Sequence, residues 1–195
     1  MGSHYYDKNP ISRENRKEIS FRFLAVEYSF ISDDGVFSKD KLDTGTRILL
    51  ETISKLKLTG KILDYGSGIG VIGILTKKMF EETSVSGFDI NSRAVELSKL
   101  NAIKQNVDVD FRQGEKIQSG LYDVILMNPP IRTGKQNIYS MFKDSYDHLK
   151  EDGQLIIVIR KSHGANSAIK ELQTYFSEVE IINRDKGFFI IRSNR

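Results

Sequence analysis

The chain has 195 residues, a formal net charge of +3 at pH 7, and 29 basic against 26 acidic side chains. It contains no cysteine and three scattered histidines, which excludes disulfide bonds and thiolate metal sites and offers no spacing for histidine ligands. No apolar run approaches the roughly 18 residues of a membrane span, and no secretory leader opens the sequence. We therefore expect one cytoplasmic domain, residues 1–195, without metal and without membrane contact. The mild positive charge permits a polyanionic partner but is too sparse to indicate an autonomous nucleic-acid binder.

The first segment, residues 1–38, predicts an extension built around a β-hairpin. Residues 19–31 alternate apolar and polar side chains, which is typical of two strands with one buried face. A helix is expected next, capped by Asp43 or Thr44 and running through Lys57.

Residues 39–195 predict a core in which strands and helices alternate. Apolar runs that indicate strands lie at 61–65, 84–88, 107–111, 122–127 and 154–159, with helical patterns at 71–82, 92–105 and 137–150. Apolar strands separated by helices favour an α/β fold with a parallel sheet covered on both faces. The run at 154–159 is the most apolar, so we expect it to be central. After a helix at 165–176, the strands at 178–183 and 187–192 are too closely joined for a parallel crossover, which predicts an antiparallel hairpin.

A glycine-rich turn follows the first strand of this core. Asp64 stands near the end of the strand, and Gly66-Ser67-Gly68-Ile69-Gly70 opens the next helix. Glycines at alternate positions let the backbone approach a ligand with no Cβ in the way. Asp64 is placed to accept a hydrogen bond from a ligand cation such as an amino group. Asp89 ends the second strand, 19 residues beyond Gly70, where an acid can bind both hydroxyls of a ribose.

The same loop also fits a dinucleotide fingerprint, because Gly68-Ile69-Gly70-Val71-Ile72-Gly73 matches G-x-G-x-x-G. That match begins three residues past the strand, whereas a dinucleotide turn begins immediately after it. Counting from Gly66 instead, the third glycine is replaced by Val71. The spacing therefore argues against a nicotinamide cofactor. An acid ahead of the first glycine, here Asp64, makes the loop resemble that of methyltransferases, which implies S-adenosylmethionine rather than a turn without a ligand.

A possible target site follows the strand at 122–127, in the sequence Asn128-Pro129-Pro130-Ile131. The prolines remove two backbone donors and leave carbonyls free to accept. The Asn128 amide oxygen and the Pro129 carbonyl can together accept hydrogen bonds from a planar, conjugated amine. Holding its hydrogens orients the nitrogen toward a methyl donor without a dedicated general base. The motif can also simply end a strand, but its place at the carboxyl end of a parallel strand favours a ligand site.

Together these residues resemble the class I S-adenosylmethionine-dependent methyltransferases. Nearly the whole chain is similar to the small single-domain relatives of the 16S ribosomal RNA guanine-N2 methyltransferases. The resemblance outside the cofactor loop rests on His4-Tyr5-Tyr6, Gly35-Val36-Phe37-Ser38, Asp43-x-Gly45, Lys161-x-x-Gly164-Ala165 and Lys186-Gly187-Phe188. It implies a Rossmann-like, seven-stranded, mostly parallel sheet with one antiparallel strand in the C-terminal hairpin. The implied cofactor is S-adenosylmethionine, and the implied partner is ribosomal RNA or the small ribosomal subunit.

The resemblance also assigns roles to residues around these motifs. In related enzymes an aromatic residue usually follows Asn-Pro-Pro, but this chain has Ile131, so Phe37 is a candidate for the aromatic surface. Ser67, Ile90, Asn91 and Asn128 join Asp89 as expected cofactor contacts, and Glu115 is a candidate for the adenine. Arg160 and Lys161 are candidates for binding RNA phosphates.

Three alternatives remain open: methylation of a protein glutamine, methylation of a small molecule, and a non-catalytic assembly factor that binds S-adenosylmethionine and RNA. The sequence gives no indication of the oligomeric state.

Overall fold

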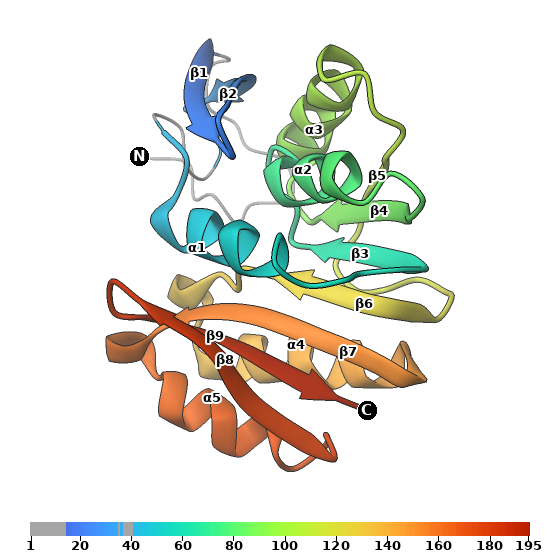
Figure 1. Ribbon diagram of the computed structural model, residues 1–195, viewed down its shortest axis with the longest axis vertical. Coiled ribbons are helices and arrows are strands. Elements are labelled where there is room, and N and C mark those ends of the chain that lie inside the picture. The colour runs from blue at the N-terminus through green and yellow to red at the C-terminus, as the bar shows by residue number, and fades with distance from the viewer. Residues whose placement is uncertain (1–14, 35, 37–40) are drawn as a thin grey trace.

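The computed structural model describes residues 15–34, 36 and 41–195 (Figure 1). Its main sheet has seven strands in the order β5-β4-β3-β6-β7-β9-β8. The strands are β3 (Lys61–Tyr65), β4 (Ser84–Asp89), β5 (Asp110–Gln113), β6 (Tyr122–Met127), β7 (Leu149–Arg160), β8 (Glu178–Asp185) and β9 (Phe188–Asn194). Strands β3 to β7 are parallel, and β9 pairs antiparallel with both β7 and β8. The expected mostly parallel sheet with one antiparallel strand is thus confirmed.

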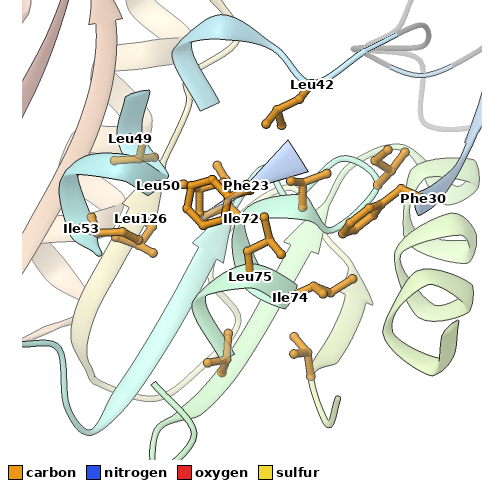
Figure 2. Packing of buried hydrophobic residues seen from close by; sticks show 14 of the residues in the cluster. Phe23, Phe30, Leu42, Leu49, Leu50, Ile53, Ile72, Ile74, Leu75 and Leu126 are labelled. Atoms are coloured by element: carbon orange, nitrogen blue, oxygen red, sulfur yellow. The ribbon is translucent and has the colours of Figure 1, made fainter. Parts of the chain in front are cut away.

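Helices cover both faces of this sheet, as expected. They are α1 (Thr44–Ile53), α2 (Val71–Met79), α3 (Ser92–Lys104), α4 (Lys135–Asp147) and α5 (Ala165–Leu172), with short 3-10 turns η1 (Ile131–Thr133) and η2 (Lys161–His163). Side chains alternate along β6, so that Val124 and Leu126 join a cluster with α1, α2 and α3. Ile125 and Met127 join a second cluster with α4 and α5. Figure 2 shows part of the first cluster, where Leu50 and Ile53 of α1 pack near Leu126.

Strand β7 lies fifth in the sheet, so the expectation that the run at 154–159 is central was wrong by one position. The middle strand is β6. The run is nevertheless flanked by strands on both sides and buried on both faces, with Ile156 in the first cluster and Ile157 in the second. Burial between two helical layers accounts for its apolar composition.

Several predicted elements have other bounds: α2 ends at Met79 rather than 82, α4 spans Lys135–Asp147 rather than 137–150, α5 ends at Leu172 rather than 176, and β7 begins at Leu149 rather than 154. For α1 and β5, local hydrogen bonds account for the difference. Helix α1 stops at Ile53 rather than Lys57, since the amides of Lys55 and Leu56 turn back to carbonyls three residues earlier. Strand β5 covers Asp110–Gln113 rather than 107–111. The Val107 amide donates to a carbonyl at the end of α3, which delays pairing with β4.

The N-terminal hairpin is confirmed as a separate two-stranded sheet of β1 (Arg16–Phe23) and β2 (Val26–Asp33). Leu24 and Ala25 form its turn with positive φ angles of 44° and 65°, the sense of turn that matches strand twist. Phe23 and Phe30 enter the first core cluster (Figure 2), so the alternating face is buried as expected. In the part of the chain that the structure describes, no helix is long and apolar enough to cross a membrane.

Asn101 of α3 joins this hairpin to the glycine loop. Its Oδ1 accepts from the Ile31 amide at 2.7 Å, while its Nδ2 donates to the carbonyls of Ile31 at 2.9 Å and Ile69 at 3.0 Å. The side chain is fully buried. Nearby, Arg93 forms a largely buried ion pair with Asp33 at 3.1 Å. The hairpin is therefore tied to the core by polar contacts as well as by apolar packing.

We expect Asn101→Ala to lower the free energy of unfolding by about 2–3 kcal/mol, because the substitution leaves buried backbone groups without partners. Urea denaturation measures this. Gln105→Ala is the matched control, since Gln105 makes a single bond to the hairpin, to the Ser29 carbonyl, and should cost under about 1 kcal/mol. Equal losses in the two variants would contradict the special role of Asn101.

Candidate functional site

The candidate site lies where the strand order reverses, between β3 and β6. Chain order runs outward from β3 through β4 to β5 on one side, and from β6 to β7 on the other. Tyr65 pairs with Phe88 of β4 and with Met127 of β6, so the residues that follow these strands emerge together. Figure 1 shows the arrows of β3 and β6 pointing to one side, where the β8–β9 turn also lies. Such a reversal is the usual ligand site of an open α/β sheet.

The glycine loop between β3 and α2 has the open form expected from the sequence. Gly66, Gly68 and Gly70 have φ angles of 75°, 52° and 88°, which glycine adopts without strain. A Cβ added at Gly66 would meet nothing within 4 Å, so the backbone is open to a ligand there. The amides of Gly66 and Ser67 donate to the Phe88 carbonyl at 3.0 and 2.9 Å, which fixes the loop to the end of β4.

Asp64 is fully buried beneath this loop. Its Oδ2 accepts a hydrogen bond from the Gly73 amide at 2.8 Å, whereas its Oδ1 is buried without a hydrogen-bond partner among the described residues. Burial raises the pKa of Asp64 to about 7, the Gly73 bond opposes this, and the charge of Asp89 adds to the rise. An unpartnered buried carboxylate oxygen fits a cationic amino group, as the sequence predicts.

Asp89 holds the loop from the other side. Its Oδ2 accepts from the Gly68 amide and its Oδ1 from the Asn91 amide, at 2.8 and 2.9 Å. Burial raises its pKa, while these backbone donors oppose the shift. Each carboxylate oxygen has two acceptor positions, so Asp89 retains capacity to accept from ribose hydroxyls.

Two of the expected cofactor residues make hydrogen bonds within the protein. The Asn91 amide oxygen caps α3 by accepting from the amides of Arg93 and Ala94. The Ile90 carbonyl accepts from Gln113 Nε2 at 3.1 Å. Glu115 is exposed just beyond β5. Contacts of Ile90, Asn91 and Glu115 with a cofactor stay predictions.

Asn128 follows β6 and is held by the start of α1. Its Nδ2 donates to Asp43 Oδ2 at 3.0 Å and to Thr46 Oγ1 at 2.9 Å. Asp43 also caps α1 by accepting from the Thr46 amide at 2.8 Å. The sequence showed Asp43 as a helix cap but gave no signal that it lies beside a residue 85 positions away. With both Nδ2 hydrogens directed to these acceptors, the amide oxygen is the part of Asn128 that remains for a target amine.

The residues after Asn128 differ in their surroundings. Pro129 is buried, and the Pro130 carbonyl closes η1 by accepting from the Thr133 amide and hydroxyl. The role of the Pro129 carbonyl as an amine acceptor stays a prediction. Ile131 is partly buried and packs against the second core cluster. Its contact with a target stays a prediction.

An aromatic residue that the motif analysis did not select, Phe188, lies next to this site. Its Cε1 is 3.1 Å from the position that a Cβ on Gly45 would take, so the ring contacts the first turn of α1. The Arg160 guanidinium lies over the ring, 5.6 Å from its centre, and both Arg160 and Lys161 are exposed. The signal for Phe188 was its place in the resemblance. Phe37, the aromatic residue named from the sequence, lies outside the described residues.

Comparison with known proteins decides the family. Residues 27–192 match the family model described as Methyltransferase small domain. This chain belongs to the methyltransferase small domain family.

The relatives of this small-domain methyltransferase include ribosomal RNA enzymes. It is 38% identical over 200 residues to the uncharacterized protein YbxB of Bacillus subtilis, covering 100% of both chains. It is 32% identical over 174 residues to the ribosomal RNA small subunit methyltransferase C of Pseudomonas entomophila, covering 85% of this chain and 50% of that protein. A solved structure of similar fold is the T. thermophilus 16S rRNA N2 G1207 methyltransferase in complex with AdoMet and guanosine. The TM-score is 0.83 and the identity 19%, covering 92% of this chain and 50% of that one. The small-domain methyltransferase thus spans about half the length of these two ribosomal RNA enzymes.

The raised pKa of Asp64 predicts a pH-dependent stability for this methyltransferase in the absence of ligand. The folded chain holds the Asp64 proton more tightly than the unfolded chain, so this stabilisation is full below pH about 4 and is lost as pH rises through about 7. Asp64→Asn cannot ionise. At pH 8.5 we expect the free energy of unfolding of this variant, measured by urea denaturation, to be about 2–4 kcal/mol higher than that of wild type. At pH 4 this difference should be gone. A difference that stays constant across this range would contradict the assignment.

Proposed function

We propose that residues 1–195 form one S-adenosylmethionine-dependent N-methyltransferase unit that acts on guanine N2 of 16S ribosomal RNA in the cytoplasm. The observation that carries the proposal is the Asn128 amide, whose nitrogen is bound by Asp43 and Thr46 and whose oxygen remains for a target amine. The membership of the methyltransferase small domain family supports the methyl-transfer chemistry.

The cofactor site supports S-adenosylmethionine in particular. The cofactor supplies an electrophilic methyl group when bound. The unpartnered Oδ1 of Asp64 receives its cationic amino group, and Asp89 receives the ribose hydroxyls. The open backbone at Gly66 admits the ligand against the loop. The T. thermophilus enzyme of similar fold was solved with this cofactor, which agrees with the assignment.

The target site favours an exocyclic amine. The nitrogen of such an amine is conjugated and a poor nucleophile, and positioning is what the protein can contribute. The Asn128 oxygen and the Pro129 carbonyl accept the two hydrogens of the amine and turn its nitrogen toward the methyl group. With the cofactor bound, a nitrogen–methyl bond would form as the methyl–sulfur bond breaks, which would leave S-adenosylhomocysteine, and the amine would lose one proton to solvent. This chemistry requires no protein base, and the two acceptors proposed here, an amide oxygen and a carbonyl, are not bases at neutral pH.

Basic side chains around the site support RNA as the substrate. Arg160 and Lys161 are exposed at the end of β7, and the Lys161 amide donates to the Gly187 carbonyl at 2.8 Å. That bond brings the β8–β9 turn alongside, where Arg184 and Lys186 are also exposed. A rim of cations beside a target site suits a phosphate backbone. Two of the proteins compared above, from Pseudomonas entomophila and T. thermophilus, are methyltransferases of small-subunit ribosomal RNA by name.

Transfer of a tritiated methyl group tests the function. The purified protein is incubated with labelled S-adenosylmethionine and, separately, with undermethylated small ribosomal subunits, naked 16S RNA and total protein. We expect label in RNA, recovered as N2-methylguanosine after digestion to nucleosides.

Asn128→Ala is the control for this assay. It should leave cofactor affinity nearly unchanged while kcat collapses, because the lost contact orients the amine in the transition state. Label in methylglutamine would overturn the RNA substrate. Cofactor binding without transfer to any substrate would instead indicate a non-catalytic factor, and full turnover by Asn128→Ala would mean that the motif only ends a strand.

The basic rim predicts a salt-dependent affinity for RNA. Arg160→Ala combined with Lys161→Ala should weaken binding of a 16S RNA fragment. It should also reduce the slope of log Kd against log salt concentration by about 1–2. Fluorescence anisotropy across salt concentrations measures both. Lys55→Ala with Lys57→Ala, beyond the opposite end of α1, is the matched control and should change neither. An unaltered slope in the Arg160/Lys161 double variant would mean that RNA does not bind at this rim.

A further inference from the structure

We propose that Asp43 is a positioning residue for methyl transfer: it holds the Asn128 amide in the one orientation that presents an acceptor to the target amine. This inference rests on the proposed function of Asn128. Asp43 is not part of the motifs that follow the strands, which are the glycine loop, Asp89 and Asn128-Pro129-Pro130. It contacts the site from the start of α1.

The hydrogen bonds determine which end of the amide faces Asp43. An ionised carboxylate can only accept, so the group that Asn128 directs at Asp43 must be the amide nitrogen. Asp43 Oδ2 lies 3.0 Å from Asn128 Nδ2, and Thr46 Oγ1 lies 2.9 Å from the same atom. One amide nitrogen carries two hydrogens, and these two acceptors use both. The Asn128 oxygen is thereby directed away from α1.

Asp43 is itself held in place. The oxygen that accepts from Asn128 also accepts from the Thr46 amide at 2.8 Å, as the cap of α1. The helix behind it is anchored by Ile48, Leu49 and Leu50, all buried in the first core cluster. A Cβ on Gly45 would lie 3.1 Å from Asp43 Oδ2, so the glycine leaves the carboxylate room to reach Asn128.

Without Asp43 the amide loses the group that distinguishes its two ends. Rotation of the amide by half a turn would then direct Nδ2 at the target amine, and two donors would face each other. Cofactor binding does not involve this contact and should be unaffected. The loss of a hydrogen bond to a charged group corresponds to roughly a tenfold to hundredfold fall in kcat.

Asp43→Ser separates this role from helix capping. Serine is a good helix cap but is too short to reach Asn128. We expect Asp43→Ser to lower kcat roughly tenfold to a hundredfold, with nearly unchanged affinity for S-adenosylmethionine and an unchanged melting temperature. Asp43→Asn is the conservative variant, because its Oδ1 can take the place of Oδ2, and it should restore most of kcat. Glu51→Ala, partly exposed on the same helix, is the control and should behave as wild type.

A double-mutant cycle tests whether Asp43 acts through Asn128. In the Asn128→Ala background, Asp43→Ser should have no further effect on kcat. Additive losses would overturn the proposal, as would an Asp43→Ser enzyme with full kcat.

A second measurement needs no activity. In ¹H–¹⁵N spectra the Asn128 side-chain amide, assigned by its loss in Asn128→Ala, should exchange slowly with solvent in wild type and faster in Asp43→Ser. Equal exchange rates in wild type and Asp43→Ser would show that Asp43 does not fix the Asn128 amide. If wild type does not methylate RNA but this difference is present, the proposed function fails while the contact stands.

Discussion

The parallel pairing of β3 with β4 on one side and β6 on the other is the constraint on which the site depends. Tyr65 faces Phe88 in one ladder and Met127 in the other, so the glycine loop, Asp89 and Asn128 emerge at one edge. Both faces of these strands are buried, and a slip of one residue would turn every side chain to the opposite face. The packing of the two helical layers therefore determines the separation between the cofactor residues and the target residues.

The site contains two buried carboxylates, and the hydrogen bonding of one of them is incomplete among the described residues. Asp64 keeps one oxygen unpartnered among the described residues, and Asp89 shares its oxygens with loop amides. An ionised carboxylate that is buried without full compensation costs free energy. A ligand that supplies a cation there offsets this cost, so ligand affinity and fold stability are linked. The same residues that weaken the empty protein thus favour the bound one.

Patterns within a short stretch of chain predicted most of the elements and the three strand-end motifs. The glycine loop and the C-terminal hairpin were found because local spacing determines them. The end of α1 and the start of β5 were missed, since they depend on particular hydrogen bonds rather than on periodicity. Asp43 was visible as a helix cap and as part of the resemblance, but its contact with Asn128 was not, because that contact arises from the packing of α1 against the sheet. Phe188 entered only through the resemblance, since its contact with α1 joins segments far apart in sequence.

The attachment of the N-terminal hairpin bears on how this protein can be shortened for study. Within the described residues, strand β2 pairs with β1 alone, in a sheet of two strands. A chain cut to begin at β2 would lack that partner, and an unpaired strand edge is a template for association with other chains. Removal of both strands would uncover the apolar surface that Phe23 and Phe30 fill and would take Ile31 away from Asn101. Removal of residues from this end should therefore cause aggregation during expression, and this effect should precede any loss of catalytic activity.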